Sequence, residues 1–406
     1  MDVGETRYRS TGSSPQDRRA ADRIHQIVEQ FVADGKAPGV VVKILRDGRT
    51  LYERAIGERD MASHAPMELD TRFALASMSK PFTSVAIMQL VEQGKIGLED
   101  SLVSVLPQFA KMAVHGSDGQ SAGGRITFHQ LLTHTSGLSY GAIKVPGSGN
   151  IVSDMYFDAE VLYHRVVREK PAASSKTLEE MVDRLVDMPL AYEPGTLWEY
   201  SIASDVLARV VEVLSGERFD RYLSKYLFAP LGMTRTGYFC RDRSQLATNY
   251  DPDPQGDLVA NEVAERYVEE PTFFGGGGEL ITTAGDYASF DQMLLNGGSL
   301  GESRVLSPQS VALMTRNYLS DAQRAELSKV TVGAMPNYGF GYGFAVAVEA
   351  DEVAGVAKGD YFWNGGGGTV NWVDPENGVV GVIMKHVRFD LDLGIAQDIR
   401  KALRAS

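Results

Sequence analysis

The segment Ser77-Met78-Ser79-Lys80 places a hydroxyl group and an amine three residues apart. On a helix this spacing puts both side chains on one face, so the lysine can approach the serine hydroxyl. A serine hydroxyl is a weak nucleophile at neutral pH until a neighbouring base accepts its proton. Pro81 is best tolerated in the first turn of a helix, which places the expected helix start close to Ser77. Backbone N–H groups of that turn would stabilise an oxyanion, so the segment predicts acyl transfer through a covalent serine intermediate.

Two other serines, Ser121 and Ser299, match the more widespread hydrolase motif Gly-x-Ser-x-Gly. That motif works where the serine lies on a sharp turn between an apolar strand and a helix. Residues 115–124 form a polar, glycine-rich stretch with no strand pattern before it, and Ser299 follows a helical pattern instead of preceding one. We therefore interpret both serines as loop residues.

The remaining reactive side chains favour structural roles. His134 has no acidic partner at a motif spacing, and His129 lies five residues before it, which does not align two metal ligands on a helix. Neither run of four glycines continues into a phosphate-binding loop. Cys240 is the only cysteine, which excludes an intramolecular disulfide. We therefore expect no metal ion and no cofactor.

The composition narrows the class of protein. Of the 406 residues, 43% are hydrophobic and 23% are charged, which is the balance of a globular protein with a sizeable core. The net charge of −13 and the lack of a run of lysine and arginine argue against a nucleic-acid partner. The polar N-terminal stretch has no signal-peptide core, and no apolar stretch approaches the roughly 18 residues of a membrane span. We expect a cytoplasmic protein with no membrane partner.

The hydrophobic pattern indicates which elements position Ser77. Residues 15–34 have the spacing of a helix. Two strand-like runs follow on either side of Asp47-Gly48, which is a strong hairpin signal. A second helix is expected to begin near Ser77 and to end at Gly94.

Beyond this helix the pattern changes twice. Residues 95–270 show mainly helical patterns with long loops, strand patterns return after Pro271, and an amphipathic helix over 394–404 closes the chain. Strands near both ends predict an α+β fold, an antiparallel sheet flanked by N- and C-terminal helices with an inserted helical domain. The expected division is a disordered lead over 1–14, a discontinuous α/β domain over 15–80 and 271–406, and a mainly helical domain over 81–270. We expect the active site to lie between the last two domains.

Several blocks of the sequence, spread over nearly the whole chain, resemble the class C β-lactamase-like superfamily of penicillin-recognising serine hydrolases. Within it the chain is most similar to the family VIII carboxylesterases. The blocks are SMSKPFTSVA (77–86), ITFHQLLTHTSGL (126–138), EPGTLWEYS (193–201), APLGMTRTGYF (229–239), GGGGELITTAGDYASF (275–290) and FWNGGGGTVNWVDP (362–375). Their common order makes the resemblance far more specific than any single block.

The resemblance implies a β-lactamase/transpeptidase-like fold and assigns a second catalytic element. The family's Tyr-x-Asn corresponds here to Tyr200-Ser201-Ile202, so Tyr200 and Lys80 would act together as general base and acid, and Ile202 departs from the pattern. Either Lys80 takes the proton of Ser77 as a neutral amine, or it stays charged and holds Tyr200 as a phenolate. The sequence leaves both possibilities open.

The third element of the family is Lys-Thr-Gly in β-lactamases and Trp-Gly-Gly in many family VIII esterases. Here it reads Trp363-Asn364-Gly365, followed by Gly366. The resemblance assigns the oxyanion hole to the backbone N–H groups of Ser77 and Gly366. It assigns contact with the substrate to Trp363, Asn364, Gly365 and Ile202.

The implied activity is that of a serine carboxylesterase, which hydrolyses short-chain esters through an acyl-enzyme on Ser77. Acyl transfer to an alcohol, weak β-lactamase or D-amino-acid peptidase activity, and a non-catalytic binding or assembly role are the alternatives. Residues 139–175 form a partly aromatic insertion. It is either a surface excursion or, through Tyr156 and Phe157, a wall of the acyl pocket. The expected partner is a small-molecule ester substrate, and the sequence leaves the oligomeric state open.

Overall fold

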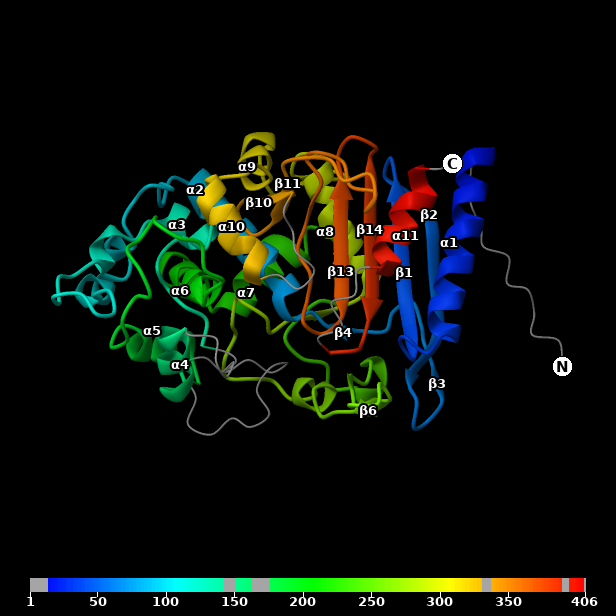
Figure 1. Ribbon diagram of the computed structural model, residues 1–406, viewed down its shortest axis with the longest axis horizontal. Coiled ribbons are helices and arrows are strands. Elements are labelled where there is room, and N and C mark those ends of the chain that lie inside the picture. Colours follow the sequence, from blue (N-terminus) through cyan, green and yellow to red (C-terminus); the bar gives the residue numbers. More distant parts are fainter. Residues whose placement is uncertain (1–13, 142–149, 162–175, 331–336, 389–393, 405–406) are drawn as a thin grey trace.

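Strand patterns near both ends of the chain produce one antiparallel sheet in the computed structural model, which describes residues 14–141, 150–161, 176–330, 337–388 and 394–404. Within these residues eight strands form this sheet, in the order β10-β11-β12-β13-β14-β1-β2-β3 (Figure 1). β1 pairs with β2 next in sequence and with β14 from the far end of the chain, where Val41 lies opposite Met384. The bounds are β1 Gly39–Arg46, β2 Arg49–Asp60, β3 Ala65–Pro66, β10 Tyr338–Phe340, β11 Ala345–Ala347, β12 Tyr361–Phe362, β13 Thr369–Asp374 and β14 Val379–Lys385.

The turn between β1 and β2 is the predicted hairpin. Its two central residues, Asp47 and Gly48, have φ values of 51° and 72°. A two-residue turn needs left-handed backbone at both central positions, because only then does its twist match that of the strands. The Asp-Gly prediction is therefore confirmed.

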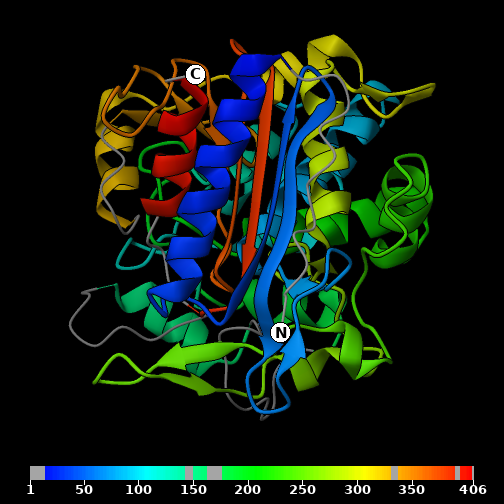
Figure 2. The same ribbon diagram turned by 90° about the vertical axis from the view of Figure 1, so that its right-hand side faces the viewer.

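Helices cover both faces of the sheet. α1 (Pro15–Ala33) and α11 (Gly394–Arg404) pack side by side on one face (Figure 2). α8 (Ala284–Leu295) packs against β14 and β1 on the other face. Alternate residues of β1 serve the two layers, since Val40 joins the core under α1 and α11 and Val41 joins the core on the opposite side. The predicted α+β class, with helices from both ends of the chain on the sheet, is confirmed.

The helices of the middle of the chain lie beside the sheet and fill the left half of Figure 1. α2 (Lys80–Glu92) packs against α6 (Ala203–Ser215), and its residues from Lys80 to Leu90 are all buried. The predicted division into domains stays a prediction. The other elements are α3 (Phe128–Leu132), α4 (Ile151–Asp158), α5 (Leu178–Leu185), α7 (Phe219–Leu223), α9 (Pro308–Met314), α10 (Asp321–Val330), β4 (Phe73–Ala74), β5 (Tyr250–Pro252), β6 (Leu258–Ala260), β7 (Ile281–Thr282), β8 (Ser299–Leu300) and β9 (Ser303–Arg304).

The start of α1 marks the start of the described chain. Ser14 caps this helix, because its hydroxyl accepts the N–H of Asp17 at 3.1 Å. Residues 1–13, the rest of the predicted disordered lead, lie outside the described residues. Within the described ranges, no helix combines the length and apolar character needed to cross a bilayer. The same ranges contain no group of three His, Cys, Asp or Glu side chains that could hold a metal ion.

Candidate active site

Ser77 lies in a short 3₁₀ helix, Ala76–Ser79, that leads directly into α2 at Lys80. The chain enters this turn from β4, which β7 holds in place by pairing. Ala76 has a φ of 46°, a left-handed conformation that residues with a Cβ rarely adopt. Such strain is retained where the surrounding structure fixes it, and it often accompanies reactive turns. The half-buried Ser77 is therefore presented at a helix start, as the sequence predicts.

Lys80 is buried directly beside Ser77. Its Nζ lies 3.3 Å from Ser77 Oγ and donates a hydrogen bond of 2.6 Å to the carbonyl of Gly277. Only 1% of the residue is exposed. The amine lies over two aromatic rings, 4.6 Å from the ring centroid of Tyr200 and 5.4 Å from that of Tyr140. The structure thus brings Ser77, Lys80 and Tyr200 together.

Tyr200 is held from the side of the sheet by Trp363. The indole Nε1 of Trp363 donates to the Tyr200 hydroxyl at 3.3 Å, and the two ring centroids are 5.4 Å apart. Trp363 follows β12 and is buried, and its N–H donates to the side chain of Asn371 on β13 at 3.2 Å. The sheet therefore fixes the tryptophan that contacts Tyr200.

The glycines after Trp363 approach the chain just before Ser77. A Cβ on Gly365 would lie 2.0 Å from the carbonyl oxygen of Leu75, and a Cβ on Gly367 would lie 2.4 Å from that of Ala74. Only glycine allows this close backbone approach. Among the described residues, the N–H groups of Ser77 and Gly366 donate to no other group. Both are thus available as donors, and the oxyanion hole assigned to them stays a prediction.

Tyr140 is a residue of this site that the sequence analysis missed. Burial raises the pKa of its hydroxyl well above the usual value, and nearby negative groups add to this, while a hydrogen-bonding interaction with Ser77 acts in the opposite direction. Its ring centroid lies 5.1 Å from that of Tyr200. Tyr140 is therefore a neutral phenol next to the nucleophile. It lies two residues after a recognised block, but no motif marks it.

Two residues predicted to contact the substrate are fully buried, and for both this contact stays a prediction. Ile202 is fully buried at the N-cap of α6, and its N–H donates to the carbonyl of Ser139 at 3.1 Å. Tyr156 is fully buried, and its hydroxyl donates to the carbonyl of Pro189 at 2.9 Å. Tyr156 thus belongs to the hydrophobic core, and its place in the wall of the acyl pocket stays a prediction. Phe157 is half-buried beside it.

Asn364 is half-buried next to Trp363, and its Oδ1 has no hydrogen-bond partner among the described residues. Much of the predicted aromatic insertion, residues 142–149 and 162–175, lies outside the described part of the chain.

The model of the family described as Beta-lactamase matches residues 24–405. The chain belongs to the beta-lactamase family. The resemblance found in the sequence blocks and the predicted fold are therefore confirmed.

Similar proteins place this member of the beta-lactamase family near esterases. Esterase EstB of Burkholderia gladioli is 29% identical over 402 residues, which cover 95% of this chain and 94% of EstB. Protein Rv1367c of Mycobacterium tuberculosis is 32% identical over 346 residues, which cover 83% of this chain and 80% of that protein. The solved structure of EstCE1, described as a hydrolase with promiscuous acyltransferase activity, has a TM-score of 0.80 at 28% identity and covers 96% of this chain and 100% of its own. These relatives support a serine hydrolase or acyl-transfer activity.

His134 contacts Ser201 and packs beside the ring of Tyr200. Its Nδ1 lies 2.9 Å from Ser201 Oγ, and its ring centroid lies 5.0 Å from that of Tyr200. Burial, together with the charge of Lys80, lowers the pKa of His134 to about 3, so the imidazole is neutral. A neutral histidine that holds the residue after Tyr200 positions the tyrosine, which agrees with the structural role expected for it.

The two Gly-x-Ser-x-Gly serines lie in the settings expected of them. Ser121 is exposed in an irregular loop, where its hydroxyl donates to the carbonyl of Ala110. Ser299 lies in the short hairpin of β8 and β9. Neither occupies a turn between a strand and a helix, and the loop interpretation holds for Ser121, whereas Ser299 is the first residue of β8.

Asp205, in the first turn of α6, is a second residue that the sequence analysis missed. It is 2% exposed, and its Oδ1 accepts the N–H of Gly277 at 3.0 Å, the residue whose carbonyl binds Lys80. A Cβ on Gly277 would lie 2.5 Å from Asp205 Oδ2, so the backbone of this glycine packs directly against the carboxylate. Burial raises the pKa of Asp205 to about 6, and the charge of Lys80 opposes this rise. Asp205 therefore supplies a buried negative charge that faces Lys80 and fixes its carbonyl partner.

We expect Asp205→Asn to change the pH profile of kcat/KM. In the parent protein the carboxylate is charged above pH 6 and becomes neutral as the pH falls through about 6, so the profile should show an inflection there. The variant carries no titrating group at this position and should lack that inflection. At neutral pH its kcat/KM should be about tenfold lower, the effect of roughly 1.4 kcal/mol for one weakened charged contact. An unchanged pH profile in the folded variant would show that the charge of Asp205 does not affect the reactivity of Lys80.

Proposed function

We propose that this protein is a serine carboxylesterase that hydrolyses short-chain esters through an acyl-enzyme on Ser77. The observation that carries the proposal is the 3.3 Å approach of Lys80 Nζ to Ser77 Oγ, with the ring of Tyr200 directly over the amine. A hydroxyl with a buried amine and a phenol beside it can lose its proton as it attacks a carbonyl carbon. The esterase relatives support the same assignment.

The proposed reaction has two halves. Ser77 Oγ attacks the ester carbonyl, its proton passes to the Lys80 and Tyr200 pair, and the N–H groups of Ser77 and Gly366 receive the oxyanion. Tyr200 then protonates the leaving alcohol, and the same pair activates the water that releases the acid. The N–H that Trp363 donates to the Tyr200 oxygen orients this hydroxyl, which supports Tyr200 as the proton-carrying group.

Transfer of the acyl group to an alcohol is the second candidate. An acyl-enzyme reacts with water or with an alcohol through the same steps, and EstCE1 is described as having promiscuous acyltransferase activity. Hydrolysis of p-nitrophenyl butyrate with and without an added primary alcohol distinguishes the two, because transfer produces a new ester while nitrophenol release is unchanged or faster. Labelling of Ser77 by a fluorophosphonate probe tests the shared first half, and a protein that is not labelled would be a non-catalytic homologue.

The site predicts a preference for esters over β-lactams. At the position where the family's lysine helps to recognise the β-lactam carboxylate stands Trp363, and where its asparagine binds the substrate amide stands the buried Ile202. Each lost polar contact costs about 1–3 kcal/mol, so together they should weaken β-lactam turnover by roughly 10- to 10⁴-fold relative to a true β-lactamase. Simple esters need neither contact.

We therefore expect kcat/KM for p-nitrophenyl acetate or butyrate to be well above that for nitrocefin. Both should be measured on one preparation, with Ser77→Ala as the blank. Nitrocefin turnover equal to or faster than ester turnover would make the protein a β-lactamase in function as well as in family.

A further inference from the structure

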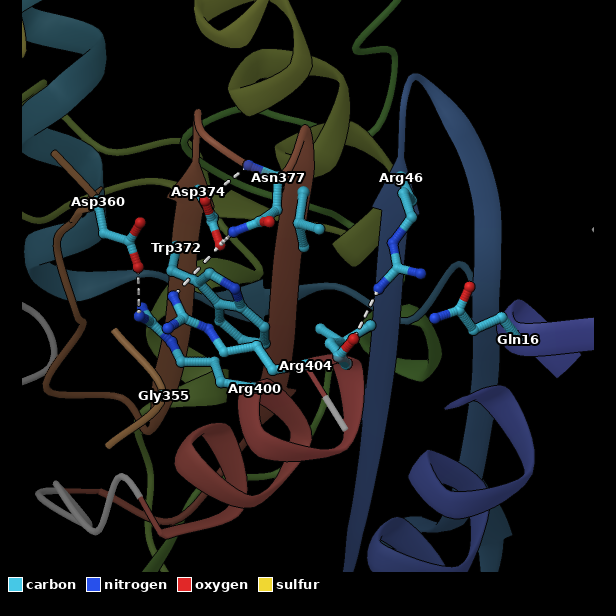
Figure 3. Close-up of a pocket in the computed structure, with 11 residues that line it drawn as sticks. Gln16, Arg46, Gly355, Asp360, Trp372, Asp374, Asn377, Arg400 and Arg404 are labelled. Carbon is cyan, nitrogen blue, oxygen red and sulfur yellow. Dashed lines mark hydrogen bonds and ion pairs between the residues drawn. The ribbon is translucent and has the colours of Figure 1, made fainter. Parts of the chain in front are cut away.

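A cavity of about 350 Å³ lies under the C-terminal half of α11, and Figure 3 shows the side chains that line it. None of the residues that line it belongs to the site around Ser77, Lys80 and Tyr200, so this cavity is separate from the catalytic site. Its apolar wall consists of Trp372, Val379 and Leu403, and its polar wall includes arginines and aspartates. Its volume falls within the range of roughly 300–1,000 Å³ that small-molecule sites occupy.

Two arginines of α11 face this cavity together. Arg400 and Arg404 are four residues apart and share one face of the helix (Figure 3). The guanidinium of Arg400 is buried, lies 4.9 Å from the centroid of the Trp372 ring and donates to Asp360 Oδ2 at 3.0 Å. Among the described residues, Arg404 pairs with Asp374 at 3.6 Å, which is longer than a hydrogen bond. Within the described part of the chain, most of the ten N–H donors of these two side chains are thus left for another acceptor.

Asp360, the carboxylate that pairs with Arg400, is easily protonated. Asp360 is completely buried, and its Oδ1 has no hydrogen-bond partner in the part of the chain that the structure describes. Burial raises the pKa of Asp360 to about 7, so near neutral pH a proton neutralises it readily. The ionisable groups that face it are Arg400 and Arg404 of α11, Asp374 of β13 and Tyr338 of β10.

The third arginine of the cavity, Arg46, is engaged elsewhere. It donates to Asp17 at 2.7 Å and to the carbonyl of Leu403 at 3.0 Å, so it ties the end of α11 to β1. The protein as a whole carries a net charge of −13, so its overall charge does not account for a cluster of arginines around a cavity. A purely structural ion-pair cluster would fill its own space, whereas this one leaves room for a ligand.

We propose that this cavity binds a small organic oxyanion, whose carboxylate or phosphate group is held by Arg400 and Arg404 and whose body packs against the apolar wall. The planar guanidinium fork matches both oxyanions in the same way. The ligand replaces Asp360 as the partner of Arg400, and Asp360 takes up a proton from solvent. Binding is therefore tighter at lower pH.

The test is isothermal titration of the full chain with benzoate and with sulfate, at constant ionic strength. Benzoate represents a carboxylate with a flat body, and sulfate represents a phosphoryl group; both keep their charge between pH 6 and pH 8. We expect saturable binding of at least one probe, about tenfold tighter at pH 6 than at pH 8, with protons taken up on binding. The tighter probe identifies the oxyanion class.

The matched variants are Arg404→Gln and Arg221→Gln. Arg404 is 35% exposed in its side chain and Arg221 is 70% exposed, so neither change removes a core residue. Arg404→Gln should weaken binding at least tenfold, while Arg221→Gln should bind as the parent does, and both should keep full ester turnover. Asp360→Asn, if folded, should bind equally at both pH values. No saturable binding of either probe, or equal binding by the two arginine variants, would overturn the proposal.

Discussion

Ser77→Ala is expected to lower kcat for short-chain p-nitrophenyl esters by on the order of 10⁶. The oxygen of this hydroxyl is the atom proposed to form the acyl-enzyme, and Lys80 Nζ lies 3.3 Å from it. Ser77 is half-buried at the start of α2, and the loss of one oxygen leaves the packing of Met78 and Leu75 unchanged. Initial rates of the purified variant, with its thermal unfolding as a check on the fold, give the measurement.

The matched controls are the two other motif serines. Ser121→Ala and Ser299→Ala should stay within a few-fold of the parent, because these residues lie in a loop and in a short hairpin. An inactive Ser121→Ala beside an active Ser77→Ala would contradict the assignment of the nucleophile.

Local sequence rules predicted the framework well. The Asp47-Gly48 turn, the strand patterns near both ends and the terminal helices follow from spacing alone, because each signal lies within a few residues. The pairing of β1 with β14 joins segments from opposite ends of the chain, and it could be expected only because strands occurred near both ends.

The parts of the site that sequence reasoning missed depend on tertiary approach. Asp205 looks like an ordinary acidic residue in the first turn of a helix, where the helix dipole favours it. Its role comes from the loop of Gly277, 72 residues later, which places a backbone N–H on the carboxylate and a carbonyl on Lys80. Likewise, Tyr140 reaches Ser77 only through the path of the chain after α3. No spacing within the sequence signals either contact.

Ile202 illustrates a different limit of the sequence. Its alignment with a substrate-binding asparagine suggested a position in the pocket, and in the structure the side chain is fully buried in the hydrophobic core at the start of α6, so its contact with the substrate stays a prediction. An alignment predicts where the backbone of a residue lies. It does not predict what the side chain does when isoleucine stands in place of asparagine.

Tyr200→Phe is expected to lower kcat by roughly 10² to 10⁴, the range for loss of a general acid–base group. The change removes only the hydroxyl, so the ring stays packed over Lys80 and beside Trp363, and the fold should be retained. Lys80→Ala should be as damaging, because the two groups move the same proton. The measurement is kcat on p-nitrophenyl acetate and on a poorer leaving group such as ethyl butyrate. The less activated ester should suffer more, since its alcohol needs the proton that Tyr200 supplies.

Tyr140→Phe is the matched control for this prediction, because Tyr140 is a second phenol beside Ser77, with its ring centroid 5.1 Å from that of Tyr200. Burial holds this phenol neutral, so its loss removes one hydrogen-bonding interaction and should cost no more than about tenfold, the equivalent of roughly 1.4 kcal/mol. The two phenylalanine variants thus separate a group that transfers a proton from one that only lies near it. A larger loss in Tyr140→Phe than in Tyr200→Phe would mean that the proton of Ser77 leaves through Tyr140, and the role assigned to Tyr200 by resemblance would pass to a residue that only the structure reveals.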